Sequence, residues 1–323
     1  MDQRRPVSNL STALASINLH DQNGGGNGNG SQGGQFSNDG QGPHRDGFNV
    51  RPDGGLGRNS GQMNDLTPQT IDRIAEYRKH PPAEGISLFS HRSAPNGFKV
   101  AVVLAELGIK FKTFYLDLKK NEQRSPYYVS INPNARIPAI IDHDNGDHSV
   151  WESGAILIYL CQKVGPDCSL WSEDYSEQSM ITSWLFFQAS GHAPMVGQAL
   201  HFRYFHPENI TSAIERYTSE VRRIYSVVEM RLAEKREQLI MEMDDDSFAL
   251  GTSALSESKY FDEPVWLVGN RITIADLSFV TWNHVVDRIG INLRSEFPEV
   301  YKWTKAMMER PAVIRALSGL ESN

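Results

Sequence analysis

The order of apolar segments along the chain constrains its fold more than any other feature. Short strand-like runs occur only before Gly165-Pro166, and they alternate there with helical patterns. After that point the pattern is helical almost throughout residues 175–317. We therefore expect an α/β domain over residues 85–165, followed by an all-α domain over residues 175–317.

The α/β segment predicts a βαβ unit, a short helix, two further strands and a last helix. Expected strands cover residues 86–90, 111–116, 137–141 and 149–151, and expected helices cover 95–107, a short stretch from 125, and 153–164. Asn145-Gly146 is the strongest short hairpin signal available. Residues 67–84 predict a leading helix and linker, because Thr67-Pro68 suits a helix start and Pro81-Pro82 stops it.

The second half predicts two helices longer than usual, over residues 177–205 and 207–243. We expect each to be kinked or broken, the first at Pro194. Residues 244–262, acidic and then small and polar, predict an inserted loop. Thr273 and Asp276 have the spacing of a capping box, which is a folding device rather than a catalytic pair.

The beginning of the chain has a composition unlike the rest. Gly, Asn and Gln supply 26 of residues 21–64, and 14 of the chain's 26 glycines lie there. Such a segment has too little apolar surface to offset its ordering entropy, so we expect residues 1–66 to form a disordered arm. The composition permits a flexible linker or a weakly prion-like tract, and the many glycines without long Asn or Gln runs favour the linker.

Charge and cysteine content exclude several functions. The formal net charge is −7, which disfavours direct nucleic-acid binding because phosphate contacts need a basic face. Two cysteines are too few for a secreted disulfide framework, so a reducing compartment is expected. No apolar run approaches the roughly 20 residues of a membrane span, and the first residues lack a signal peptide. We expect a cytoplasmic protein without membrane contact.

Three clusters of residues are candidates for ligand binding: residues 90–96, Ile137-Pro138 and Glu152-Ser153. An Ile-Pro bond before a hairpin can be cis and present the Ile137 backbone to a peptide-like ligand. A helix start at Ser153 offers free N–H groups to a carboxylate, and Glu152 can receive an ammonium group. The alternative for Ser153 is plain helix capping. His192, His201 and His206 lack metal-ligand spacing, so no metal site is predicted.

Together, these clusters resemble the glutathione transferase family, in which a thioredoxin-like domain precedes an all-helical one. Within it, the chain is most similar to the fungal regulators of nitrogen catabolite repression, whose yeast member is also a prion. The resemblance covers about residues 85–317 and is carried by Ser90–Val100, Asn132–Ala139, Trp151–Ala155, Gly191–Met195, Ala199–Phe205 and Phe297–Trp303.

The resemblance implies a homodimer that binds glutathione and retains GATA-type transcription activators in the cytoplasm. By position, Asn96 faces the thiol, Gln123 lies near the glycine end, Ile137 offers its backbone beside Pro138, and Glu152 with Ser153 hold the γ-glutamyl group. The yeast regulator has histidine where this chain has Gln123. Its prion arm also has long Asn and Gln runs, whereas this arm is Gly-rich and charged, which makes amyloid conversion doubtful.

Position 96 bears on the choice between two functions. Transferases usually ionise the thiol with a Tyr, Ser or Cys side chain, and an amide such as Asn96 stabilises a thiolate less well. Conjugation is therefore expected to be weak, and the resemblance implies glutathione-dependent peroxidase and thiol–disulfide exchange activity instead. The competing function is a detoxifying transferase or peroxidase with an incidental arm. The competing role for Asn96 is to cap a helix that begins at Gly97.

Overall fold

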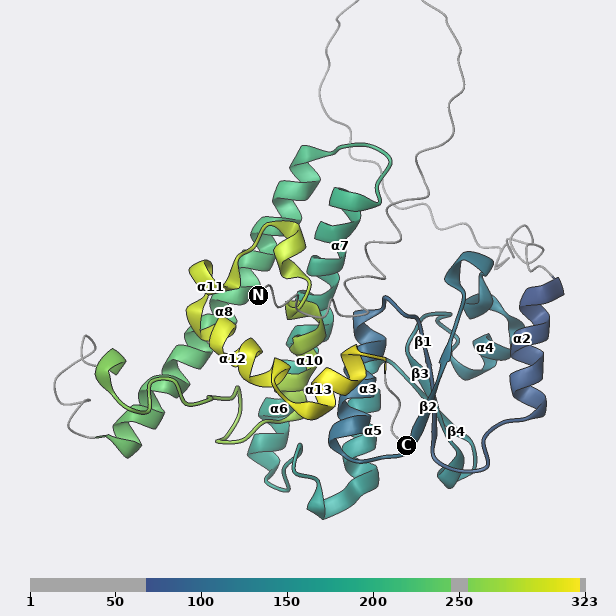
Figure 1. Cartoon of the computed structure of the whole chain (residues 1–323), viewed down its shortest axis with the longest axis horizontal. Helices are drawn as coiled ribbons and strands as arrows, with labels where there is room; N and C mark the ends of the chain where they lie inside the picture. The colour runs from purple at the N-terminus through teal and green to yellow at the C-terminus, as the bar shows by residue number, and fades with distance from the viewer. Residues whose placement is uncertain (1–67, 245–254, 320–323) are drawn as a thin grey trace, which may run out of the picture.

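The computed structural model describes residues 68–244 and 255–319. The predicted arm over residues 1–66 lies outside them, as does most of the predicted insertion at 244–262. Figure 1 shows two neighbouring bodies, a sheet with its helices and a larger group of helices that follows it in the chain. The predicted fold class, a thioredoxin-like domain followed by an all-α domain, is confirmed for the described residues.

The first body is built around a four-stranded sheet in the order β2-β1-β3-β4. Its strands are β1 (Ile86–Ser90), β2 (Phe111–Tyr115), β3 (Ala139–Asp142) and β4 (His148–Trp151). β1 and β2 are parallel and joined by α3 (Pro95–Glu106), whereas β3 pairs antiparallel with both β1 and β4. This is the βαβ unit and hairpin that the sequence predicts.

Helices cover both faces of the sheet. Because side chains alternate along a strand, Leu88 packs into the large core shared with the helical domain, while Phe89 packs into a smaller one. The smaller core includes Ile74 of α2 (Pro68–Lys79) and Tyr128 of α4 (Pro126–Ile131). On the other face lie α3 and α5 (Ser153–Val164).

The two long helical stretches behave differently from each other. The first divides into α6 (Tyr175–Phe187), a π-turn η6 (Gln188–His192) and α7 (Ala193–Tyr204), so the break comes just before Pro194. The second forms α8 (Thr211–Met243), 33 residues without interruption, and the expected break there is wrong. α8 contains neither proline nor glycine, and it packs against α7 and against α12 (Pro298–Met308).

The remaining helices complete the second body and tie it to the first. They are α10 (Ile274–Asn283), α11 (Leu293–Glu296), α12 (Pro298–Met308) and α13 (Pro311–Leu317). Short 3₁₀ turns occur in both bodies, at Leu118–Lys120, Glu122–Arg124, His143–Asn145, Gly165–Asp167, Leu255–Glu257 and Val286–Ile289. α3 packs against α10 and α13, and Arg310 binds Glu106 with contacts of 2.6 and 2.8 Å. None of the described helices is long and apolar enough to cross a membrane.

Asp276 connects three segments inside the helical domain. Its buried carboxylate accepts hydrogen bonds from the Leu267 and Thr273 backbone N–H groups, both at 2.9 Å, and from the Thr273 hydroxyl and Trp303 Nε1, both at 3.0 Å. The Thr273 hydroxyl accepts from the Ala275 N–H, which closes a capping box at the start of α10. The pair therefore has a structural role.

Candidate functional site

The sheet register brings the predicted site residues to one end of the α/β domain. Phe89 pairs with Ala139, which in turn pairs with Trp151, so the end of β1, the start of β3 and the end of β4 lie side by side. Residues 90–96 follow β1, Ile137-Pro138 precedes β3, and Glu152-Ser153 follows β4. β2 runs parallel to β1 and ends at the same edge, and Gln123 comes after it.

Asn96 is the second residue of α3 and is half-buried. Its Oδ1 accepts a hydrogen bond of 2.9 Å from Trp282 Nε1, and the Thr281 hydroxyl donates to the Pro95 carbonyl at 2.9 Å. The start of α3 is thus fixed by α10 of the other domain. The cap of α3 is Ala94, so the alternative in which Asn96 caps a helix beginning at Gly97 is wrong.

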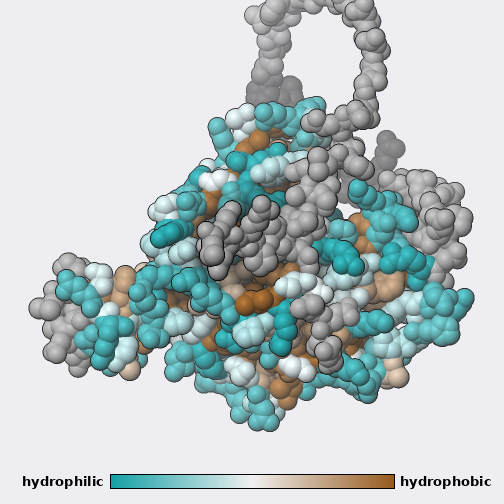
Figure 2. Space-filling model, viewed as in Figure 1, coloured by the Kyte–Doolittle hydropathy of each residue, from teal (hydrophilic) through white to brown (hydrophobic). Residues whose placement is uncertain are grey.

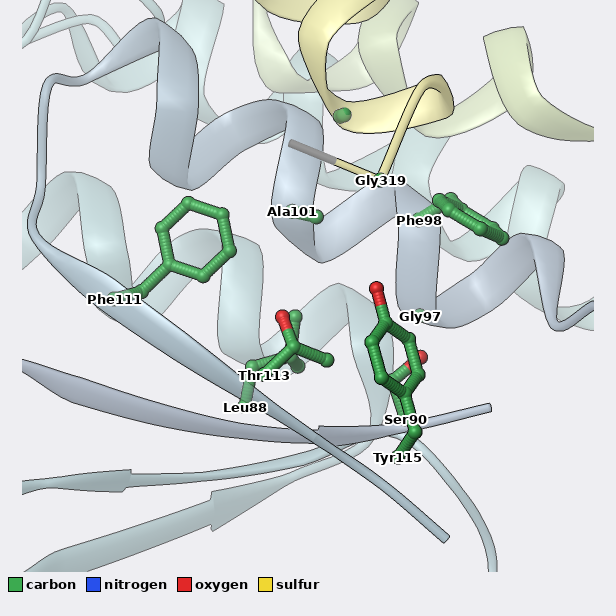
Figure 3. Close-up of a pocket in the computed structure, with 10 residues that line it drawn as sticks. Leu88, Ser90, Gly97, Phe98, Ala101, Phe111, Thr113, Tyr115 and Gly319 are labelled. Carbon is green, nitrogen blue, oxygen red and sulfur yellow. The ribbon is translucent and has the colours of Figure 1, made fainter. Parts of the chain in front are cut away.

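Gly97 lets α3 approach β1 closely. A Cβ at this position would lie 1.8 Å from the Ser90 hydroxyl oxygen, so any larger residue would force the two elements apart. Figure 3 shows the crevice beside this contact, where Phe98 and Ala101 of α3 lie over Thr113 and Tyr115 of β2. It holds only about 10 Å³, barely the space of one water, so it is not a ligand site.

The turn before β3 leaves backbone groups unused. The Ile137–Pro138 peptide bond is cis. The Arg136 carbonyl accepts from the Tyr128 hydroxyl at 2.6 Å and from Asn132 Nδ2 at 2.7 Å, which fixes the turn. Within the described residues, the Ile137 backbone makes no such bond. Its N–H and C=O remain available to an extended ligand.

Gln123 lies in the 3₁₀ turn Glu122–Arg124. Its Oε1 is buried and has no hydrogen-bond partner among the described residues. The neighbouring Glu122 is fully buried, accepts from the Asp117 N–H at 2.7 Å and pairs with Arg73 at 3.2 Å, so the turn is firmly held. A buried oxygen without a donor fits a position where a ligand supplies one.

Glu152 and Ser153 form the start of α5. Glu152 is the cap residue, has φ of +69° and makes no side-chain hydrogen bond to the helix. Its side chain is exposed, whereas Ser153 is buried as the first helical residue. Plain capping by Ser153 is therefore not what the structure has. The backbone of Glu152 is strained, its carboxylate is exposed, and no side chain caps the helix start beside it. Such a site is suited to a ligand that bears both an ammonium and a carboxylate group.

Sequence reasoning missed one charged residue near these positions. Lys99, on α3, is 1% exposed, and its Nζ donates to Gln188 Oε1 at 2.8 Å. Burial lowers its pKa to about 7, while the Glu152 carboxylate acts in the opposite direction. Its neighbours Phe98 and Val100 are apolar, and that buried context was the available signal.

The histidines contribute no metal site in the part of the chain described. His192 is fully buried in the helical core, and burial followed by the charge of Lys99 lowers its pKa to about 3. His201 packs against Phe202 and His206 through ring contacts. No group of three His, Cys, Asp or Glu side chains among residues 68–244 and 255–319 could hold an ion.

Two family models match the chain: the glutathione S-transferase N-terminal domain over residues 84–162 and the C-terminal domain over residues 192–311. The protein URE2 of Debaryomyces hansenii is 54% identical over 98% of this chain and 97% of that protein. The chain belongs to the Ure2 branch of the glutathione S-transferase family. The transcriptional regulator URE2 of Saccharomyces cerevisiae is 59% identical over 80% of this Ure2-family chain and 74% of that protein.

Solved structures of Ure2p agree with this assignment. Ure2p in complex with glutathione superimposes with a TM-score of 0.75 and 61% identity, covering 76% of this chain and 99% of that one. The nitrogen regulation fragment of the yeast prion protein Ure2p gives a TM-score of 0.67 and 60% identity, over 74% and 99% of the two chains. The resemblance predicted from the sequence is confirmed.

Proposed function

We propose that this Ure2-family protein is a glutathione-binding regulator of nitrogen catabolite repression. The observation that carries the glutathione part is the convergence of Asn96, Ile137 and Glu152 at one end of the sheet, beside the uncapped start of α5. The regulatory part is supported by the similarity to the transcriptional regulator URE2 and to the nitrogen regulation fragment.

The γ-glutamyl, cysteinyl and glycyl parts of glutathione each have a partner in this proposal. The Glu152 carboxylate receives the γ-glutamyl ammonium group, and the start of α5 with Ser153 binds the adjacent carboxylate. The Ile137 backbone pairs with the cysteinyl peptide unit, and the buried Gln123 Oε1 accepts an N–H near the glycine end. Asn96 faces the thiol.

The chemistry at the thiol is expected to be secondary to regulation. The Asn96 oxygen is engaged by Trp282, which leaves the amide Nδ2 to donate to sulfur. Because a neutral amide is a weaker stabiliser of thiolate than an activated hydroxyl, conjugation of electrophiles is expected to be slow. Peroxidase turnover instead consumes two glutathione molecules and one hydroperoxide, and yields glutathione disulfide, an alcohol and water.

The proposed partners are a second copy of this chain and a GATA-type activator retained in the cytoplasm. A homodimer is supported by large hydrophobic side chains exposed on and near α6, with Tyr175 82% and Phe186 66% exposed. Most of the face in Figure 2 is hydrophilic, with scattered hydrophobic residues between. Exposed aromatic side chains of this size are typical of protein interfaces.

A pull-down from host extract tests the regulatory proposal. The purified full chain is incubated with extracts of cells grown on rich or poor nitrogen, and the recovered GATA-type activator is quantified. Recovery that depends on the nitrogen source supports retention. Absence of recovery, with hydroperoxide reduction by the same preparation, would favour the detoxifying enzyme. Glutathione binding is measured separately by calorimetry.

A further inference from the structure

Lys99 occupies a position that packing alone does not explain. It lies one helical turn after Asn96 on α3, and residues three apart share a helix face. Its ammonium carries three donors, yet Gln188 Oε1 is its one hydrogen-bond partner among the described residues. A buried cation with a single neutral partner is costly, and such groups concentrate at functional sites.

The partner of Lys99 belongs to a buried polar chain in the other domain. Gln188 opens the π-turn and its Nε2 lies 3.5 Å from His192 Nδ1. His192 Nε2 lies 2.9 Å from the Tyr225 hydroxyl, which donates to Asn283 Oδ1 at 2.8 Å.

One arrangement of protons satisfies this whole chain. Because Tyr225 donates to Asn283, it accepts from His192 Nε2, which makes Nδ1 the acceptor for Gln188 Nε2. Gln188 Oε1 then faces Lys99 as an acceptor. The neutral network holds the ammonium in place and supplies no negative charge to compensate it.

We propose that the buried ammonium of Lys99 stabilises the thiolate of glutathione bound beside Asn96. The inference rests on the proposed glutathione site. Three residues of helix rise by about 4.5 Å, so Lys99 and Asn96 lie about one turn apart, and the charge of Glu152, at the same end of the sheet, acts on Lys99. We take a separation of roughly 10 Å between the cation and the sulfur. At that distance and an effective dielectric constant near 20, a unit charge shifts an ionisation by about one pKa unit.

The groups around Lys99 are consistent with this role. Burial lowers the pKa of Lys99 and the Glu152 carboxylate acts against that shift, while the lowered pKa of His192 keeps the imidazole ring neutral near pH 7. β1 has no titratable side chain. The other titratable side chains on elements packed against α3 are Tyr159, Cys161 and Lys163 on α5, Asp276 on α10, and Arg310 and Arg315 at α13. Lys99 is the buried cation among them.

The test measures the thiol pKa of glutathione bound to the full-length protein. Thiolate absorbance near 240 nm is followed between about pH 5 and 10 with saturating glutathione, and affinity is measured by calorimetry. Lys99→Met is expected to raise the bound thiol pKa by up to about one unit, a loss of thiolate of up to tenfold that is largest below pH 7, where Lys99 is fully charged. Lys99→Arg carries its charge at every pH and is expected to give a thiol pKa at or below the wild-type value. Lys112→Met removes an exposed lysine on β2 and is expected to change nothing.

A structural role for Lys99 would give a different result. If Lys99→Met binds glutathione with an unchanged thiol pKa, the inference is overturned while the proposed glutathione site stands. If the wild-type protein binds no glutathione, the proposed site fails, and this inference with it. Gln188→Leu gives a second route, because it removes the acceptor, lowers the charge on Lys99 and is expected to raise the thiol pKa in the same direction.

Folding of the variant is checked by its thermal midpoint. The pKa of Lys99 is lowered from 10.5 to about 7, so the folded state binds this proton less tightly than the unfolded chain does. Burying the charged form therefore lowers the stability of the wild-type protein, by the largest amount below pH 7 and by none as the pH rises toward 10.5. Lys99→Met is therefore expected to melt higher than wild type, with the larger difference at low pH.

Discussion

The starts of α5 and α10 solve the same problem in opposite ways. Each helix has N–H groups at its first turn that lack partners within the helix. At α10, Thr273 and Asp276 satisfy them with a complete capping box. At α5, Glu152 has a positive φ and gives no side-chain cap.

The difference separates a structural helix start from one suited to binding. Asp276 is fully buried, and four hydrogen bonds join its carboxylate to Leu267 in the preceding loop, to the cap residue Thr273 and to Trp303 of α12. Glu152 is exposed and leaves the start of α5 open. We infer that side chains at a helix start contribute to stability when they point inward and to binding when the donors are left free.

The largest effect on stability is expected at the start of α10, which side chains cap. Asp276→Ala removes the acceptor of four buried donors and is expected to lower the free energy of unfolding by about 3–5 kcal/mol. Urea denaturation measures this, with the exposed Asp167→Ala as the control. A loss below about 1 kcal/mol would show that the capping box does not organise the helical domain.

A substitution at the uncapped start of α5 is expected to affect glutathione binding instead. Glu152→Gln keeps the shape of the side chain but removes its charge, so glutathione affinity should fall by about 1.5–3 kcal/mol, or roughly 10- to 150-fold. Calorimetry measures it, and Glu215→Gln on α8 is the matched control. Wild-type affinity in Glu152→Gln would contradict the assignment of the ammonium group.

The smallest effect is expected from a substitution that tests whether the backbone of Glu152, at the start of α5, is strained. Glu152→Gly permits the positive φ and is expected to raise the free energy of unfolding by about 1 kcal/mol while weakening glutathione binding. Glu215→Gly, inside α8, is expected to lower it by a similar amount, because glycine disfavours a helix interior. If both substitutions changed the free energy of unfolding in the same direction, the backbone of Glu152 would not be strained.

Local interactions made much of the fold predictable. Strand β1 and helix α5 have the bounds that the sequence predicts, because alternation, helical period and turn residues act over a few positions. The continuity of α8 was not predictable from its length, since it packs against α7 and α12 and stays uninterrupted over 33 residues. The family motifs by themselves predict Asn96, Ile137 and Glu152 as site residues.

The sequence by itself determined the order of elements, the capping box of α10 and the residue types available to a glutathione site. Only the tertiary structure decided that these residues meet at one end of the sheet, that Trp282 holds Asn96, and that Lys99 is buried against Gln188. The physical reason is the distance along the chain over which each interaction acts. Capping and periodicity depend on neighbours in the chain, whereas the surroundings of Lys99 come from a segment 89 residues away that only folding brings near.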